Sequence, residues 1–315
     1  MGGGVVLFTI LALSLMFASC ADNSDTDDEN PSPALPANVG ENPITKTIKL
    51  KKSDSDSRYL ELNADGTARA IYVDDDEESK DKETINCAYK YSYDNEKKTV
   101  TMIVEKSVYY TLFGEEKVQL LTYDEICSEL NKDCTVEKMK QDFKKQYEKY
   151  KNDEWFKEDY PDCDTYEKYE KAILKESGFD SFAALAEYQK QFAKNEFKAY
   201  FSAQITYAYK IDNGKMTLTE KFTGVKNLFT SECRLSDNSH AEIYSTWASI
   251  YENDVYYGGG TPNTDKKTII IESSEDGEKV EATYTEDIAA ETVTIKFKGK
   301  EYVYKFEGEE YIQVE

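Results

Sequence analysis

The sequence predicts an α+β protein in which an antiparallel β-meander, barrel-like or two-layered, is interrupted by an α-helical insertion. Two observations predict this fold class. Apolar residues alternate with a period of two over 45–113 and 204–315, as they do in half-buried strands. Over 114–203 the period becomes that of amphipathic helices. We therefore expect one β domain, 45–113 with 204–315, that is split by a helical insertion.

The first 20 residues predict a signal peptide. An uncharged apolar run of about 14 residues is shorter than the ~20 that a membrane-spanning helix needs. The run ends in Phe17-Ala18-Ser19-Cys20, which resembles the lipobox of bacterial lipoproteins. This resemblance implies that Cys20 becomes the first residue of the mature protein and carries a lipid, such as palmitate, that holds the chain on a membrane. A cut after Ala21 and an uncleaved anchor are the alternatives.

Residues 21–44 predict a disordered tether. This stretch is acidic, rich in proline and nearly without apolar residues, so it has little to bury and its like charges repel. At about 3 Å per residue it could reach ~70 Å. An acidic stretch directly after the lipidated cysteine resembles the export signal of surface lipoproteins. We expect a cell-envelope location, with the outer membrane or cell surface favoured over the inner membrane and secretion as the alternative.

Strands joined by polar turns follow the tether. Tyr59–Leu62 leads to Asp65-Gly66 and returns as Thr67–Val73, which is the pattern of a β-hairpin, and a second hairpin runs over 84–104. With the hairpins near the C-terminus, they resemble the lipocalin-like β domains of bacterial envelope lipoproteins. The resemblance covers 45–113 and 204–315, and it implies a barrel that could hold a small apolar ligand.

One pattern of thirteen positions occurs twice in the β domain. Tyr89–Thr101 and Tyr207–Thr219 share two tyrosines, an Asp-Asn pair, a lysine and two threonines at the same spacing. A duplicated β unit would explain this pattern. Hairpins with polar tips also select these residue types without duplication, so both explanations stay open.

The helical insertion carries aromatic stripes. Met139, Phe143, Tyr147 and Tyr150 share one face of a Lys/Glu-rich helix, and similar stripes follow up to Tyr200. Aromatic stripes at this spacing favour a helical core over a sugar- or peptide-binding wall. Strands resume after Gln204 with Asp-Gly and Lys-Gly turns, and such a long antiparallel series avoids bare edges by closing into a barrel or by forming two layers.

The composition limits the partners and the chemistry. The net charge of −23 opposes nucleic-acid binding and favours cations or basic proteins. The single histidine, His240, lies in a polar loop and makes a His-rich metal site or a histidine-based triad improbable. We expect no cofactor and no metal. Among 62 acidic residues, no pair is marked out as the two carboxylates of a glycoside hydrolase.

Five cysteines remain when Cys20 is set aside. Cys127, Cys134 and Cys163 lie in the helical insertion, whereas the other two lie in the β-rich parts. A disulfide within the insertion is one possibility, and Cys127–Cys134 is the favoured pair because a short helix end and turn separate them. Thiols that are buried without a bridge are an equal alternative.

A recognition loop is predicted around Tyr256-Tyr257-Gly258-Gly259-Gly260. The glycines favour a flexible turn with exposed aromatic residues, and Trp247 and Tyr251 are close in sequence. We therefore expect a non-catalytic, lipid-anchored envelope protein that binds a small apolar ligand in its β domain or a protein partner through aromatic residues. A hydrolase with paired carboxylates and a purely structural surface protein are the alternatives.

Overall fold

The computed structural model describes residues 31–55, 57–73, 82–109, 119–228, 233–234, 241–252 and 255–314. Cys20 with the predicted signal peptide, the first part of the tether and His240 lie outside these residues. The chain divides into two compact units. One contains the helices of the insertion up to Phe197, and the other contains the β-sheets with the end of the last helix.

The strands lie on both sides of the helical insertion, as the sequence predicts. The first group is β1 (Ile48–Lys52), β2 (Arg58–Leu62), β3 (Thr67–Val73), β4 (Glu83–Asp94), β5 (Thr99–Tyr109) and β6 (Gln119–Leu121). The second group is β7 (Gln204–Asp212), β8 (Lys215–Lys221), β9 (Cys233–Arg234), β10 (Ala241–Ile243), β11 (Ala248–Glu252), β12 (Val255–Gly260), β13 (Pro262–Asn263), β14 (Thr268–Ser273), β15 (Lys279–Asp287), β16 (Thr292–Phe297), β17 (Lys300–Phe306) and β18 (Glu310–Gln313).

Five α-helices of the described chain lie between these groups. They are α2 (Tyr123–Asp133), α3 (Val136–Tyr150), α4 (Glu154–Asp159), α5 (Tyr166–Ser177) and α6 (Phe182–Ser202), and a short 3-10 helix, η1 (Val225–Asn227), follows β8. No helix in this part of the chain has both the length and the apolar character that crossing a membrane requires.

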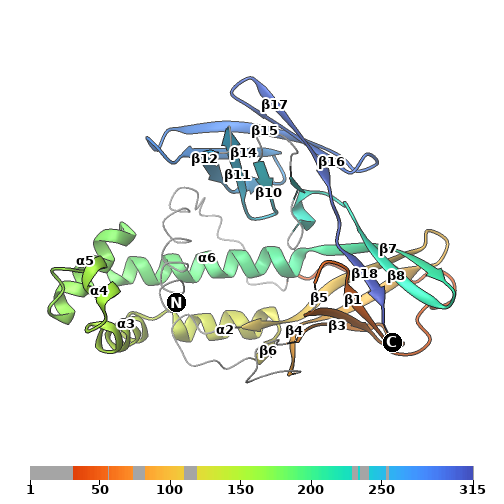
Figure 1. Cartoon of the computed structure of the whole chain (residues 1–315), viewed down its shortest axis with the longest axis horizontal. Helices are drawn as coiled ribbons and strands as arrows, with labels where there is room; N and C mark the ends of the chain where they lie inside the picture. The colour runs from red at the N-terminus through yellow and green to blue at the C-terminus, as the bar shows by residue number, and fades with distance from the viewer. Residues whose placement is uncertain are drawn as a thin grey trace. The chain divides into compact units, whose positions relative to one another are not determined.

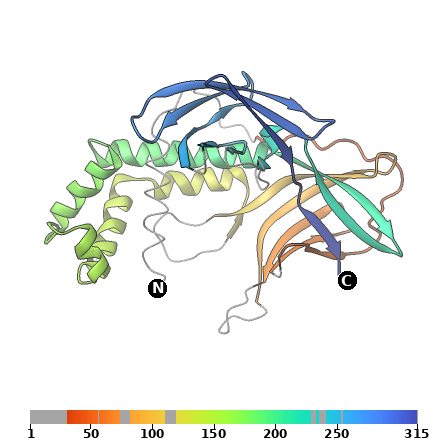
Figure 2. The same cartoon turned by 45° about the horizontal axis from the view of Figure 1, so that its top comes forward.

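The first sheet closes into an antiparallel barrel. Eight of its nine described strands follow the order β1-β2-β3-β4-β5-β7-β8-β18, and β18 pairs with β1 to complete the ring (Figure 1). The ninth strand, β6, lies next to β5. Leu50 of β1 is opposite Gln313 of β18, so the two ends of the β domain meet in this pairing. Figure 2 shows the dark blue C-terminal strand beside the teal β7–β8 hairpin. The predicted α+β fold class, with a meander that an insertion interrupts, is confirmed.

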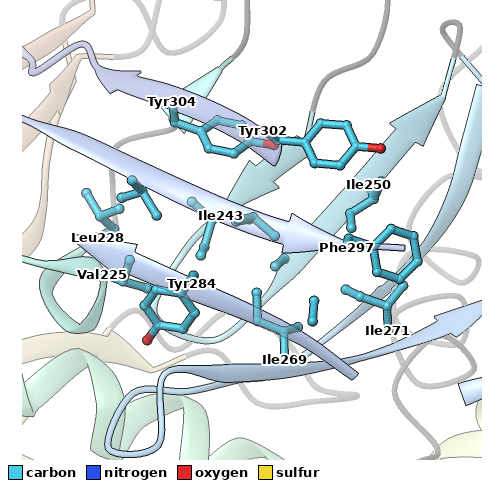
Figure 3. Close-up of a cluster of buried hydrophobic side chains, with 14 of the residues drawn as sticks. Val225, Leu228, Ile243, Ile250, Ile269, Ile271, Tyr284, Phe297, Tyr302 and Tyr304 are labelled. Atoms are coloured by element: carbon cyan, nitrogen blue, oxygen red, sulfur yellow. The ribbon is translucent and has the colours of Figure 1, made fainter. Parts of the chain in front are cut away.

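The second sheet is a half-barrel with the order β10-β11-β12-β14-β15-β16-β17-β9. The last strand of the described chain, β18, belongs to the barrel. Strands β9–β17, which precede it, therefore pair only with one another. The inner face of this sheet and the η1 segment share a cluster of buried apolar and tyrosine side chains (Figure 3). The labelled members are Val225, Leu228, Ile243, Ile250, Ile269, Ile271, Tyr284, Phe297, Tyr302 and Tyr304.

The predicted hairpin turns form as expected. In the β2–β3 turn, Asp65 Oδ1 accepts hydrogen bonds from the Thr67 amide at 3.0 Å and from its hydroxyl at 2.7 Å. Gly66 adopts a φ of 87°, a left-handed conformation that glycine takes without strain. The Asp-Gly-Thr sequence therefore fixes the turn and the register of the strands that it joins.

The two copies of the repeated pattern form hairpins that differ in register. β4–β5 and β7–β8 are neighbours, because β5 pairs with β7. In the first hairpin Asp94 is opposite Thr99, whereas in the second Asp212 is opposite Lys215. The lysine of the pattern thus lies in a turn in one copy and in a strand in the other. This difference favours hairpin chemistry over duplication as the origin of the pattern.

The aromatic stripes of the insertion form a helical core, as predicted. Met139, Phe143 and Tyr147 of α3 are buried together with residues of α4, α5 and α6. The Tyr147 ring lies 5.7 Å from the Tyr169 ring of α5, so the two helices share an aromatic contact. Thr165 caps α5 by accepting a hydrogen bond from the Lys168 amide at 3.4 Å.

The glycine run of β12 differs from the predicted flexible turn. Gly258, Gly259 and Gly260 are buried in a strand, between β11 and β14. A Cβ atom on Gly258 would collide with the carbonyl oxygen of Glu272, and one on Gly260 with that of Ile270. The glycines are needed here because neighbouring backbone approaches too closely for a side chain.

We predict that Gly260→Ala lowers the free energy of unfolding by about 3 kcal/mol, because the neighbouring backbone must move to accept the methyl group. Gly277→Ala is the control: Gly277 has a φ of 71° and no atom within 4 Å of its Cβ position, so this change costs only about 1 kcal/mol of backbone strain. Urea denaturation of both variants measures the difference, and equal losses would contradict the packing argument.

Candidate functional site

Three of the four predicted recognition residues lie on one face of the β11–β12 hairpin. Ala248 and Ile250 of β11 belong to the half-barrel core, so the alternating residues Trp247, Ser249 and Tyr251 point to the opposite face. Tyr256 of β12 is directly opposite Tyr251 and joins them. We call Trp247, Tyr251 and Tyr256, all partly exposed, the aromatic face.

Trp247 is held flat against the hairpin. Its indole Nε1 donates a hydrogen bond to Ser249 Oγ at 2.7 Å, which fixes the orientation of the ring. A Cβ atom on Gly259 would collide with the indole, so the missing side chain at this position makes room for the ring. Gly259, which was predicted to lie in a flexible turn, therefore allows the Trp247 indole to pack closely on the strand.

Tyr251 and Tyr256 form an aromatic pair across the two strands. Their ring centroids are 5.4 Å apart with an interplanar angle of 62°, an edge-to-face arrangement. Partial burial, with a smaller effect of Tyr251, raises the pKa of Tyr256. The Tyr256 phenol is therefore neutral near pH 7 and can donate a hydrogen bond, while both rings offer apolar contact area.

Tyr257 points to the other side of the sheet, so it does not belong to the aromatic face. The register of β11 and β12 shifts between Ile250 and Tyr251, which leaves Tyr257 as an extra residue on β12. Its ring packs against Phe297 of the core at 5.3 Å, and its hydroxyl accepts a hydrogen bond from Lys298 Nζ at 2.5 Å. Strand alternation places the two adjacent tyrosines on opposite faces, and the β-bulge decides that Tyr256 joins Tyr251 while Tyr257 faces the core.

A second group of polar side chains lies inside the barrel, near the end where α6 enters β7. We call it the polar cluster: Lys52, Cys87, Tyr200, Glu220, Glu309 and Tyr311. Lys52 and Tyr311 are register partners of β1 and β18. Lys52 Nζ is 2.9 Å from Glu309 Oε1, and the Tyr311 hydroxyl donates to Glu309 Oε2 at 3.0 Å. The Glu309 amide donates to Glu220 Oε2 at 3.3 Å.

Cys87 and Tyr200 continue the polar cluster. The Tyr200 hydroxyl, from the end of α6, donates a hydrogen bond to Cys87 Sγ at 3.2 Å, and the thiol donates to the carbonyl oxygen of Lys106 at 3.2 Å. Burial raises the pKa of Cys87 to about 11 and also raises that of Tyr200. The thiol is therefore protonated near pH 7, the opposite of what a nucleophilic cysteine requires.

Sequence reasoning missed the polar cluster. Glu220 is 5% exposed and occupies the inward position that follows Met216 and Leu218 in β8. The sequence does contain one signal, because Glu220 is a carboxylate at a strand position where the alternation predicts an apolar residue. The rest of the polar cluster could not be found from the sequence. Lys52 and Glu309 are far apart in the chain and meet only when β18 pairs with β1.

The structure places the two cysteines of the predicted disulfide on one helix. Both are thiols. Cys127 lies in α2 and Cys134 directly follows it, with its amide bonded to the Leu130 carbonyl as in the helix. Seven helical residues separate Cα atoms by about 10 Å, beyond the ~7 Å limit of a disulfide. A bridge would therefore require the end of α2 to unwind.

The chain shows no match to family models, to curated proteins or to solved structures. Within the described ranges, His, Cys, Asp and Glu side chains form no group of three that could hold a metal ion.

We predict that stability falls from about pH 9 to pH 11, partly because of Cys87. The folded state raises the pKa of this thiol from 9.0 to about 11, so unfolding releases a proton in this range and the stabilisation present below pH 9 is lost. Cys87→Ala should lose about 2–3 kcal/mol less between pH 8 and 11 than the wild type. Urea denaturation at four pH values tests this, and parallel curves would contradict it.

We also predict strong coupling between Lys52 and Glu309, whose side chains are 12% and 13% exposed. Lys52→Met should lower the free energy of unfolding by about 3 kcal/mol, because it leaves a buried carboxylate without its cation. The double variant with Glu309→Gln should lose less than the sum of the single variants by at least about 1 kcal/mol. Additive losses in the double-mutant cycle would show that the pair is uncoupled.

Proposed function

We propose that this chain is a lipid-anchored protein of the cell envelope and that its folded part is a non-catalytic module that binds a protein partner through the aromatic face. The aromatic face is the observation that carries the binding proposal. Trp247, Tyr251 and Tyr256 present large aromatic rings, and residues of these types dominate the energy of protein interfaces. The net charge of −23 favours a basic partner.

The anchoring proposal is supported by the N-terminal sequence. An apolar run that stops at Cys20 and is followed by an acidic stretch fits a lipidated envelope protein better than a secreted one. The eight-stranded antiparallel barrel is compatible with the lipocalin-like resemblance. That compatibility concerns the fold and carries no ligand with it.

A small apolar ligand within the β domain is less well supported than a protein partner. The inner face of the half-barrel is occupied by its own side chains, which are at most 4% exposed in the buried cluster. In the barrel, Leu50, Met102 and Leu218 are at most 1% exposed. An eight-stranded barrel has an interior that side chains can fill, and these residues fit that description.

A hydrolase with paired carboxylates is also less well supported. Glu309 is the acidic residue nearest to Glu220 in the polar cluster, and it is already bound by Lys52 and Tyr311. Such partners are typical of a structural ion pair. A purely structural role predicts that nothing binds through the aromatic face, and the experiments below test this.

We predict that mass spectrometry of the protein from its own envelope gives a chain that begins at Cys20 and carries added acyl groups. A mature chain that begins at Asp22 would instead identify a secreted protein. A native spectrum of the same sample should contain no small ligand, because side chains occupy the interior of both sheets. An extra mass that disappears on denaturation would favour the ligand-binding alternative.

We predict that Tyr256→Ala reduces binding of the partner at least about tenfold, since a central interface tyrosine commonly contributes more than ~1.4 kcal/mol. Quantitative cross-linking in the intact envelope measures the binding, and thermal unfolding verifies the fold. Tyr72→Ala is the matched control, because Tyr72 is 38% exposed on the barrel strand β3. Equal cross-linking of wild type and Tyr256→Ala would reject the aromatic face as the contact surface.

A further inference from the structure

The described part of the predicted tether, residues 31–44, is bound to the barrel. Its first contacts lie near the end of the barrel where α6 enters β7. Ser32 Oγ donates to the carbonyl oxygen of Val104 at 3.5 Å, and Gln204 Nε2 donates to the carbonyl oxygen of Ala34 at 3.1 Å. The segment thus starts on β5 and on the first residue of β7, which pair with each other.

The middle of the segment pairs with the end of β4. The Val39 amide donates to the Tyr93 carbonyl and its carbonyl accepts from the Asn95 amide, both at 2.9 Å. Asn38 Oδ1 accepts a further hydrogen bond from the Tyr93 amide at 3.0 Å. These bonds form a parallel bridge between Val39 and Asp94, and they satisfy backbone groups that the strand end would otherwise leave to water.

The last part of the segment closes onto the β2–β3 turn. Asn42 Nδ2 donates to the carbonyl oxygen of Ala64 at 3.1 Å, and Asn42 Oδ1 accepts from the Ile44 amide at 2.9 Å. The Ile44 side chain is only 1% exposed. An apolar anchor therefore ends a segment that passes from one end of the barrel to the other.

We infer that residues 32–44 are a strap that belongs to the barrel. The strap shortens the segment of chain that connects the lipid on Cys20 to the folded body. The inference rests on the proposed lipidation of Cys20. About 12 residues separate Cys20 from Ser32, and at 3.3–3.6 Å per residue they span at most ~40 Å. A tether that continued to Thr45 would reach about twice as far. The strap therefore keeps the body, and any partner that it binds, in the layer next to the membrane.

Limited proteolysis of the full lipidated chain on envelope vesicles tests the strap. A nonspecific protease should release bodies whose mass corresponds to cuts before Ser32, because the strap is bound to the barrel along its length. Released bodies that begin between residues 33 and 44 would overturn the inference. A failure of the lipid proposal gives a different result, since the body would then be found in the supernatant before protease is added.

Hydrogen exchange provides the second measurement and needs no lipid. Amides of Val39 and Asn95 should exchange slowly in the wild type, and at least about tenfold faster in Ile44→Ala and in Asn38→Ala, which each remove one attachment of the strap. Thr45→Ala is the control, because Thr45 is exposed and follows the strap directly. Unprotected amides in the wild type, or equal protection in all variants, would overturn the inference. Asn38→Ala removes a single hydrogen bond, so it keeps the test valid if Ile44→Ala does not fold.

Discussion

The pairing of β18 with β1 is the constraint on which the rest of the β domain depends. These strands come from opposite ends of the described chain, and their contact converts an open series of hairpins into a closed barrel. Closure removes two sheet edges that would otherwise expose unpaired backbone groups. It also leaves β9–β17 as a separate half-barrel, because the strand that follows them is already paired on both sides.

Closure also creates the polar cluster. Lys52 and Tyr311 become register partners, and Glu309 reaches both of them. The Glu309 carboxylate, which is largely buried, is tolerated there because the Lys52 cation and the Tyr311 hydroxyl bind it. Burial in the same cluster raises the pKa of Cys87 and of Tyr200 and keeps both groups neutral near pH 7. The barrel interior thus holds distant parts of the chain together, whereas the proposed recognition surface lies on the other sheet.

Close backbone packing determines which aromatic residues are available for recognition. At β12 the neighbouring strands approach so closely that only glycine fits, and this allows Trp247 to lie flat over Gly259. The β-bulge at Tyr257 then sends one tyrosine inward and leaves Tyr256 beside Tyr251. These residues are close together in the sequence, so their grouping could be predicted. The glycines predicted a flexible turn, and this was wrong because glycine is compatible with both a free turn and a crowded strand.

The sequence by itself determined the α+β class, the helical insertion, the hairpin at Asp65-Gly66 and the aromatic core of the helices. These features depend on local periodicity and turn chemistry, which a single stretch of chain contains. Only the tertiary structure decided that β18 closes the barrel, that Lys52 meets Glu309, and that Val39 and Ile44 attach the expected tether to the barrel. Those contacts join residues that are distant in sequence, so they stabilise the protein only after the sheet has assembled.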